Sequence, residues 1–232
     1  MAEEKRYGLQ KVTLVDYPGE VAATIFTSGC NMRCPYCHNA QLAAGETSAA
    51  FFSLEQLFDY FEKRKKLLAA VCITGGEPLL DKNINIIANQ LYKMGYKIKL
   101  DTNGTMPEKI LEIPSNYIAM DFKTAPKRYS ELGFFAKDSA KKIIKSAQTI
   151  IASDKEYEFR TTAMPGIVEA NDIKEIVKII KGAKRYVITQ FSPHNTLDPN
   201  ASLVTPHSIN VLKEFLKIAT DEGIPTTLRG IN

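Results

Sequence analysis

Short apolar runs alternate with amphipathic stretches along most of the chain. The runs are rich in β-branched and aromatic residues and have the length of buried strands. They cover residues 21–27, 70–74, 96–101, 117–121, 158–162, 185–190 and 224–228. The stretches that separate them repeat apolar residues at helical spacing. Alternating strands and helices predict a parallel sheet with helical crossovers.

Two of the helical stretches carry start signals. Ser53 and Gln56 form a capping-box pattern, and Thr205 before Pro206 predicts the start of a later helix. The apolar stripe of the first helix consists of Leu54, Leu57, Phe58 and Phe61, and that of the second of Leu212, Phe215, Leu216 and Ala219. Each stripe is wide enough to cover one face of a sheet.

The order of these elements predicts an α/β fold, a partial (β/α)6 TIM-like barrel with parallel strands. A short hairpin-like lead at residues 7–18 precedes the first strand. About six strand-helix units favour a barrel or partial barrel over a flat sheet. We see neither a low-complexity linker nor an internal repeat, so we expect one domain over residues 1–232, with a lead at 1–19 and the barrel at 20–232.

Composition excludes several classes of protein. The chain is 44% apolar and 24% charged, with 30 basic and 26 acidic side chains and a net charge of +4, which predicts no nucleic-acid partner. The first ten residues lack the apolar core of a signal peptide, and the longest apolar run, residues 67–73, is too short to cross a bilayer. We therefore expect a cytoplasmic protein without a membrane partner.

Three of the four cysteines lie in one polar loop. Cys30, Cys34 and Cys37 have the spacing C-x3-C-x2-C, which lets three thiolates converge on one metal centre. In a [4Fe-4S] cluster, three such ligands leave one iron open. A redox dithiol of Cys34 and Cys37, a zinc site completed by His38, and buried structural cysteines are the alternatives. Cys72, inside an apolar run, is predicted to be a core residue.

Other polar motifs follow the predicted strands. Thr74, Gly75, Gly76 and Glu77 end the second strand, Asp101 the third, and Asp121 with Lys123 the fourth, while His194 follows the sixth. Because the carboxyl ends of parallel strands meet at one edge, we expect these groups to share one mouth with the cysteine loop. Asp121 and Lys123 are two residues apart and therefore lie on one side of their strand.

The cysteine spacing followed by Gly75-Gly76-Glu77-Pro78 resembles the radical S-adenosylmethionine superfamily. That resemblance implies one [4Fe-4S] cluster, whose open iron binds S-adenosylmethionine and whose electron cleaves it to a 5′-deoxyadenosyl radical. Activators of glycyl radical enzymes, those of pyruvate formate-lyase and anaerobic ribonucleoside-triphosphate reductase, share further motifs. These are Cys37-His38-Asn39, Asp101-Thr102-Asn103-Gly104, Met120-Asp121-Phe122-Lys123, Met164-Pro165-Gly166, Ser192-Pro193-His194 and, for the reductase branch, Leu14-Val15-Asp16-Tyr17-Pro18-Gly19.

The resemblance also implies roles for single residues. The cluster ligands are Cys30, Cys34 and Cys37, and the residues expected to bind S-adenosylmethionine are Tyr36, Cys37, His38, Thr74, Gly75, Gly76, Glu77, Asp101, Asp121, Lys123 and His194. Asp101 and Asp121 would lie at the methionine end, with a monovalent cation, and Lys123 would meet its carboxylate. The radical abstracts the hydrogen, so no side chain is expected to act as acid or base. Arg160 receives no role at this stage.

The implied reaction needs two protein partners. One is the glycyl radical enzyme, which we expect to be the anaerobic ribonucleotide reductase, and the other is an electron donor such as flavodoxin or ferredoxin. A small-molecule radical enzyme such as 7-carboxy-7-deazaguanine synthase is the alternative enzyme. A zinc-binding interaction module is the alternative of another class, and it would leave the glycine and aspartate motifs without a use.

Overall fold

The computed structural model describes residues 5–48 and 50–231, and its chain forms two compact units. Unit 1 holds the residues up to Cys30 together with Gln41–Thr102 and Glu108–Ile118, and unit 2 holds Asn31–Ala40, Asn103–Pro107 and the residues from Ala119 onward. The chain passes between the units repeatedly, whereas independent domains are joined by few crossings. We therefore keep the single domain over 1–232 as a proposal.

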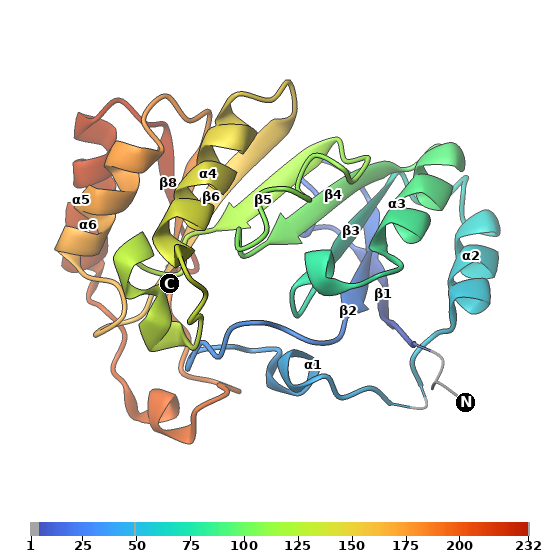
Figure 1. Ribbon diagram of the computed structural model, residues 1–232, viewed down its shortest axis with the longest axis horizontal. Coiled ribbons are helices and arrows are strands. Elements are labelled where there is room, and N and C mark those ends of the chain that lie inside the picture. Colours follow the sequence, from blue (N-terminus) through green and yellow to red (C-terminus); the bar gives the residue numbers. More distant parts are fainter. Residues whose placement is uncertain (1–4, 49, 232) are drawn as a thin grey trace. The chain divides into compact units, whose positions relative to one another are not determined.

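Unit 1 contains the first four strands. β1 (Gly8–Thr13) pairs antiparallel with β2 (Ala22–Thr27), which pairs in parallel with β3 (Ala70–Gly75), and β3 pairs in parallel with β4 (Lys97–Thr102). Its helical segments are α1 (Ala40–Ala44), α2 (Leu54–Glu62), the 3-10 turn η1 (Pro78–Leu80) and α3 (Ile84–Lys93). In Figure 1, α2 and α3 lie side by side.

Unit 2 contains most of the remaining elements. The strands are β5 (Tyr117–Asp121), which begins in unit 1, then β6 (Glu156–Ala163), β7 (Tyr186–Gln190) and β8 (Thr226–Arg229). The helical segments are η2 (Pro126–Leu132), α4 (Ser139–Ile151), α5 (Ala170–Ile179), η3 (Pro199–Leu203) and α6 (Ile209–Asp221). The strands β6, β7 and β8 are parallel, and Figure 1 shows α5 beside α6.

The eight strands are hydrogen-bonded in chain order from β1 to β8, and every described pairing after the first is parallel. The predicted α/β class with a parallel sheet is confirmed. The lead prediction needs a correction, because the hairpin is not confined to residues 7–18. Its first arm, β1, pairs with the first predicted strand itself, and the register shifts between Gln10 and Thr13.

The predicted capping box is confirmed at α2. The Ser53 hydroxyl accepts a hydrogen bond from the Gln56 N–H at 3.2 Å, and the Gln56 side chain accepts one from the Ser53 N–H at 2.9 Å. Two of the four predicted core residues, Leu57 and Phe61, are buried, whereas Leu54 and Phe58 are half-buried. The box sets where α2 begins, and the phase of its apolar stripe sets which face is buried.

Two helix predictions are wrong. The later helix begins at Ile209 with Ser208 as its N-cap, not at Thr205. Gln190 donates a hydrogen bond to the carbonyl of His207 at 2.8 Å and holds that residue outside the helix. Between β4 and β5, where a helix was expected, the described residues 103–116 form only turns and bends. Prolines 107 and 114 leave too few residues between them for a stable helix.

The core of each unit lies between strands and helices. In unit 1 it includes Ile25, Ile73 and Leu100, and in unit 2 it includes Phe159, Ile188 and Phe215, all at most 1% exposed. No helix in the described part of the chain has the length and apolar character needed to cross a membrane.

Candidate functional site

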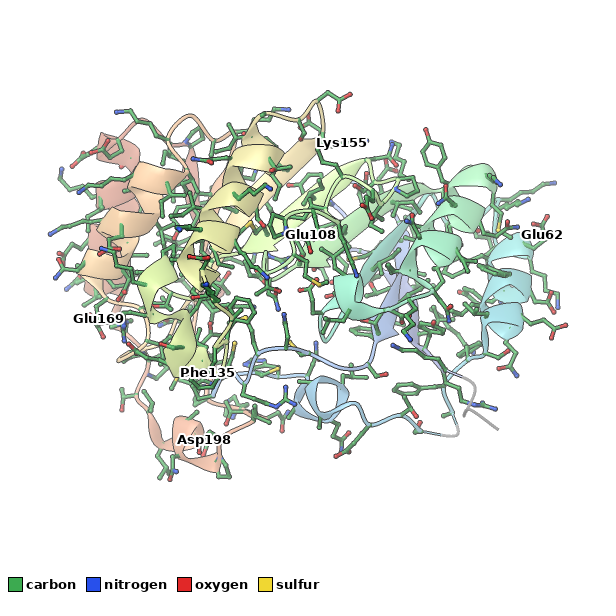
Figure 2. The ribbon with its side chains drawn as sticks, viewed as in Figure 1. Glu62, Glu108, Phe135, Lys155, Glu169 and Asp198 are labelled. Atoms are coloured by element: carbon green, nitrogen blue, oxygen red, sulfur yellow. The ribbon has the colours of Figure 1, made fainter. Side chains whose placement is uncertain are left out.

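The cysteine loop is held by backbone hydrogen bonds to two other segments of unit 2, the end of η2 and the loop after β7. The Arg33 N–H donates to the carbonyl of Leu132 at 2.7 Å, and the Asp198 N–H donates to the carbonyl of Pro35 at 3.0 Å. Asp198, labelled in Figure 2, belongs to the loop after β7 that also carries His194. A loop tied from both sides in this way keeps its shape without regular secondary structure.

The Asp101-Thr102-Asn103-Gly104 motif supplies another anchor for the loop. Asn103 donates a side-chain hydrogen bond to Asn31 at 3.0 Å, and Asn31 donates one to the hydroxyl of Thr105 at 2.8 Å. The N–H of Thr105 donates to the Asn103 side chain at 3.0 Å, which closes the network. Asn103 is 6% exposed and Thr105 is 1% exposed, so the bond between them is shielded from water. The motif fixes the residue that immediately follows Cys30.

The cysteines themselves differ in burial. Cys34 is 7% exposed, while Cys30 and Cys37 are half-buried. The Cys37 N–H donates to the carbonyl of Cys34 at 3.0 Å, so these two residues form one tight turn in unit 2. Cys30 is the last residue of its segment of unit 1. His38, the fourth ligand in the zinc alternative, is exposed.

Asp121 at the end of β5 is the centre of a charged triad in unit 2. Its two carboxylate oxygens accept hydrogen bonds from Arg160 Nε at 2.7 Å and from Lys123 Nζ at 2.9 Å. Burial by itself would raise the pKa of Asp121, but the two cations outweigh it and hold that pKa well below its usual range. The carboxylate is therefore ionised at neutral pH, and its two oxygens are fixed in direction.

Lys123 is held through its backbone as well as its side chain. Its N–H donates to the phenol oxygen of Tyr129 at 3.1 Å, and its carbonyl accepts a hydrogen bond from the Tyr36 hydroxyl at 3.1 Å. Burial acts to lower the pKa of Lys123, but attraction to Asp121 and Cys34 raises it. Burial raises the pKa of Tyr36 well above its usual value, and the neighbouring Cys34 adds to the increase. The structure thus brings Cys34, Tyr36, Asp121 and Lys123 into one cluster.

In unit 1, Gly75 and Gly76 lie against the backbone that leads to Cys30. A Cβ on Gly76 would lie 2.0 Å from the carbonyl oxygen of Gly29, and one on Gly75 would lie 2.3 Å from that of Thr27. The Gly76 N–H donates to Thr27 O and the Glu77 N–H donates to Gly29 O, both at 2.9 Å. Glycine is required here because two backbones approach each other closely.

Glu77 is completely buried and binds within unit 1. Its Oε1 accepts hydrogen bonds from the Leu79 N–H at 3.2 Å and from the Thr102 hydroxyl at 2.8 Å. This carboxylate therefore joins the strand end of β3 to that of β4. Thr74, directly before the glycines, is half-buried, and its carbonyl accepts a hydrogen bond from the Thr27 hydroxyl at 3.1 Å.

Asp101 has a partner that the sequence did not suggest. Lys99, on the same face of β4, is 3% exposed and places its ammonium 2.5 Å from the Asp101 carboxylate and 3.7 Å from the sulfur of Cys72. Cys72 is 1% exposed, as predicted for a core residue. Lys99 was missed because a lysine in a strand is usually solvated; its position two residues from Asp101 was the available signal.

Arg160 is the other important residue without a sequence-based role. A signal that could have identified it is its position on a predicted strand that follows the one ending in Asp121. His194, by contrast, is exposed on its loop. The structure thus groups the predicted residues of unit 2 around Asp121 and those of unit 1 around the glycines and Asp101.

Comparison with known proteins gives a consistent family. The model of the radical SAM superfamily matches residues 24–180. A candidate glycyl-radical enzyme activating enzyme of Methanocaldococcus jannaschii is 34% identical over 97% of this chain and 95% of its own. This chain belongs to the radical SAM superfamily.

More distant relatives extend this result. Pyruvate formate-lyase-activating enzyme of Clostridium pasteurianum is 25% identical over 84% of this chain and 83% of its own. A 7-carboxy-7-deazaguanine synthase of Hyperthermus butylicus is 33% identical, but over only 39% of this chain and 38% of its own. The crystal structure of Streptococcus suis SuiB bound to S-adenosylmethionine has a TM-score of 0.67 at 17% identity and covers 89% of this chain and 49% of that one. The last comparison concerns the fold alone, and it agrees with the predicted barrel class.

As a radical SAM enzyme, the protein uses a [4Fe-4S] cluster and S-adenosylmethionine. The donor set fits a cluster, because Cys30, Cys34 and Cys37 offer three thiolates, one buried and two half-buried. In unit 2, the strand-end carboxylate of Asp121 and the fixed cation of Lys123 suit a ligand with an ammonium and a carboxylate group. In unit 1, Asp101 is a further strand-end carboxylate.

Proposed function

We propose that this enzyme installs a glycyl radical on a partner protein, the anaerobic ribonucleoside-triphosphate reductase. The observation that carries the proposal is the match of 34% identity along nearly all of both chains to a candidate glycyl-radical enzyme activating enzyme. Synthases that act on a small substrate match only about two fifths of this chain. The Leu14-Val15-Asp16-Tyr17-Pro18-Gly19 segment supports the reductase as partner.

The cluster and S-adenosylmethionine, when bound and reduced by one electron from a donor such as flavodoxin or ferredoxin, supply methionine and a 5′-deoxyadenosyl radical that takes one hydrogen atom from a backbone glycine. The side chains of this protein hold and orient these groups. We assign the cluster to Cys30, Cys34 and Cys37. Lys123 would meet the methionine carboxylate, since its ammonium is already held in place by Asp121 at 2.9 Å.

The remaining predicted contacts divide between backbone and side-chain groups. We assign contact with the adenine ring of S-adenosylmethionine to the backbone of Tyr36, Cys37 and His38, and contact with its adenosine part to His194. We assign binding of its methionine ammonium group to backbone and hydroxyl groups of Thr74, Gly75 and Gly76. Glu77 holds the β3 and β4 ends through Leu79 and Thr102, so we propose that it shapes this edge.

A cation site at the carboxylates remains part of the proposal. Asp101 has one ammonium partner, whereas Asp121 has one ammonium and one guanidinium partner, all at 2.5 to 2.9 Å, and a monovalent cation would have to share their oxygens. Measuring the dependence of S-adenosylmethionine cleavage on Na⁺ and K⁺ at constant ionic strength tests this part. Equal rates with a large organic cation in their place would overturn the cation site.

The test of the main proposal is anaerobic. The protein is reconstituted with iron and sulfide, reduced with dithionite and mixed with S-adenosylmethionine and the reductase encoded in the same genome. We expect 5′-deoxyadenosine by chromatography and a glycyl radical signal by electron paramagnetic resonance. Cleavage without a radical on the reductase would contradict the partner and favour a small-molecule substrate.

The cluster ligands give a sharp prediction. Cys34→Ala removes one of three thiolates and is expected to lower iron content and abolish 5′-deoxyadenosine formation. Cys72→Ala is the matched control: it lies in the core of unit 1 and should retain the cluster while lowering stability by about 1 kcal/mol. Full cleavage activity in the Cys34 variant would exclude this ligand set.

A further inference from the structure

Side chains on β6 alternate between two different environments. Phe159 and Thr161 lie on one face, where Phe159 contacts the ring of Phe122 and Thr161 accepts a hydrogen bond from the Tyr186 hydroxyl at 2.8 Å. Residues at even positions lie on the other face. That face carries Arg160, which binds Asp121, and two residues earlier it carries Glu158. Glu158 therefore shares a face with the charged triad of the candidate site.

Glu158 is a buried carboxylate, and one of its two oxygens has no hydrogen-bond partner among the described residues. Only 2% of the residue is exposed, and the oxygen without a hydrogen-bond partner is Oε2. Arg229 is an ion-pair partner of this oxygen, but its Nη2 atom lies 3.7 Å away, beyond hydrogen-bond distance. Burying a carboxylate oxygen without a donor is unfavourable. The Glu158 carboxylate is therefore suited to accept a hydrogen bond from a donor group of a bound ligand.

Arg229 reaches the same face from the last strand. It pairs in register with Thr189 of β7, and the strands β6, β7 and β8 are parallel, so its side chain lies on the side of Glu158 and Arg160. Its side chain is 54% exposed, in contrast to that of Glu158. In the described part of the chain, no strand pairs with β8 on its outer edge. A peptide can therefore approach Arg229 from solvent without displacing a strand.

We propose that Glu158 and Arg229 together recognise the backbone of the substrate segment that carries the target glycine. The two groups match one residue in extended conformation, whose N–H and C=O point to the same side. The N–H would donate to Glu158 and the C=O would accept from the Arg229 guanidinium. A glycine has no side chain, so its recognition depends on backbone groups. This inference rests on the proposed function, in which the substrate is a protein, and it names two residues that bind the substrate backbone.

The position of Glu158 separates this role from cofactor binding. Residues two positions apart on a strand are separated by about 6.6 Å along it, and this is the separation between Glu158 and Arg160. Removing the Glu158 carboxylate should therefore weaken substrate binding while leaving S-adenosylmethionine binding intact. Arg160→Met, by contrast, would disturb Asp121 directly.

The experiment compares Glu158→Met with Glu156→Met in the reconstituted holoenzyme. Glu156 is an exposed residue of the same strand, paired with Lys184 at 3.0 Å, and serves as the matched control. The KM for the intact reductase is expected to rise about 10- to 100-fold in Glu158→Met, as for loss of a hydrogen bond to a charged group. Glu158→Gln, which keeps an acceptor, should restore much of this loss. Iron content and substrate-independent cleavage of S-adenosylmethionine should be unchanged in all three variants.

Distinct outcomes overturn distinct claims. An unchanged KM in Glu158→Met, equal effects in the two methionine variants, or a parallel loss of substrate-independent cleavage would overturn the recognition role. Absence of a glycyl radical with the unmodified enzyme would instead overturn the proposed function, and this inference with it. The unmodified enzyme therefore shows which of the two claims has failed.

Discussion

The Asp121 triad shows how single residues create a fixed charge pattern. Arg160 and Lys123 bind different oxygens of one carboxylate, at 2.7 and 2.9 Å. Two cations and one anion leave a net positive charge at the end of β5. That positive charge suits a ligand carboxylate. The hydrogen bonds fix the orientation of the three charged side chains before any ligand binds.

The triad predicts a pH dependence of stability. The folded-state pKa of Asp121 lies below its unfolded value of about 3.9, so its contribution is fully present above that value and is lost as the pH falls below it. Asp121→Asn should destabilise the protein by about 1–3 kcal/mol at neutral pH, because both cations lose their anionic partner and one of them also loses its acceptor oxygen. Thermal unfolding of both proteins from pH 7 to pH 3 checks this. The difference in Tm should be constant down to about pH 5 and shrink below about pH 4. A difference that grows on acidification would contradict the assignment.

The residue scale also shows what sequence could and could not predict. Asp121 and Lys123 were predicted together because alternation on a strand places positions two apart on one side. Lys99 and Arg160 were not assigned, since their roles depend on partners brought near by strand pairing. Glu77 was predicted at the right edge, but its bond to Thr102 requires knowing that β3 and β4 end side by side.

At the scale of elements, the turn after β3 is built by backbone contact. Gly75 and Gly76 pack against the backbone of residues 27–29. The N–H groups of Gly76 and Glu77 donate hydrogen bonds to carbonyls of that segment at 2.9 Å. The segment after β2 is thereby held in the conformation that introduces Cys30. Strand ends were predictable from apolar runs, whereas this contact was not, because it depends on two loops distant in sequence.

Gly76→Ala tests the contact. A Cβ 2.0 Å from the Gly29 oxygen forces one of the two backbones to move. We expect a loss of about 1–3 kcal/mol in unfolding free energy, measured in urea, together with weaker S-adenosylmethionine binding and lower iron content. Gly182→Ala is the control, since nothing lies within 4 Å of the added Cβ and only its left-handed backbone is strained. Normal iron content and ligand binding in Gly76→Ala would show that the contact does not shape the site.

At the scale of the whole molecule, the chain path bears on how the protein folds. Segments of unit 1 and unit 2 alternate along the sequence. The part of the cysteine loop from Asn31 onward and the 103–107 turn belong to unit 2, although they are flanked by unit 1 segments. Neither unit consists of one continuous segment. A unit of this kind cannot be completed until distant parts of the chain are in place, which favours a single cooperative transition.

Equilibrium unfolding of the apoprotein tests this cooperativity. The chain has no tryptophan, so single tryptophans can report on each unit separately. Tyr92→Trp places one on α3 of unit 1, and Phe135→Trp places one after η2 of unit 2, at side chains that are 53% and 81% exposed. We expect the two fluorescence transitions in urea to coincide with each other and with circular dichroism, because each unit needs segments separated by the other. Midpoints that differ between the two variants, with each variant's circular dichroism showing two steps, would mean that the units unfold independently. In that case the single domain over residues 1–232 would have to be replaced by two.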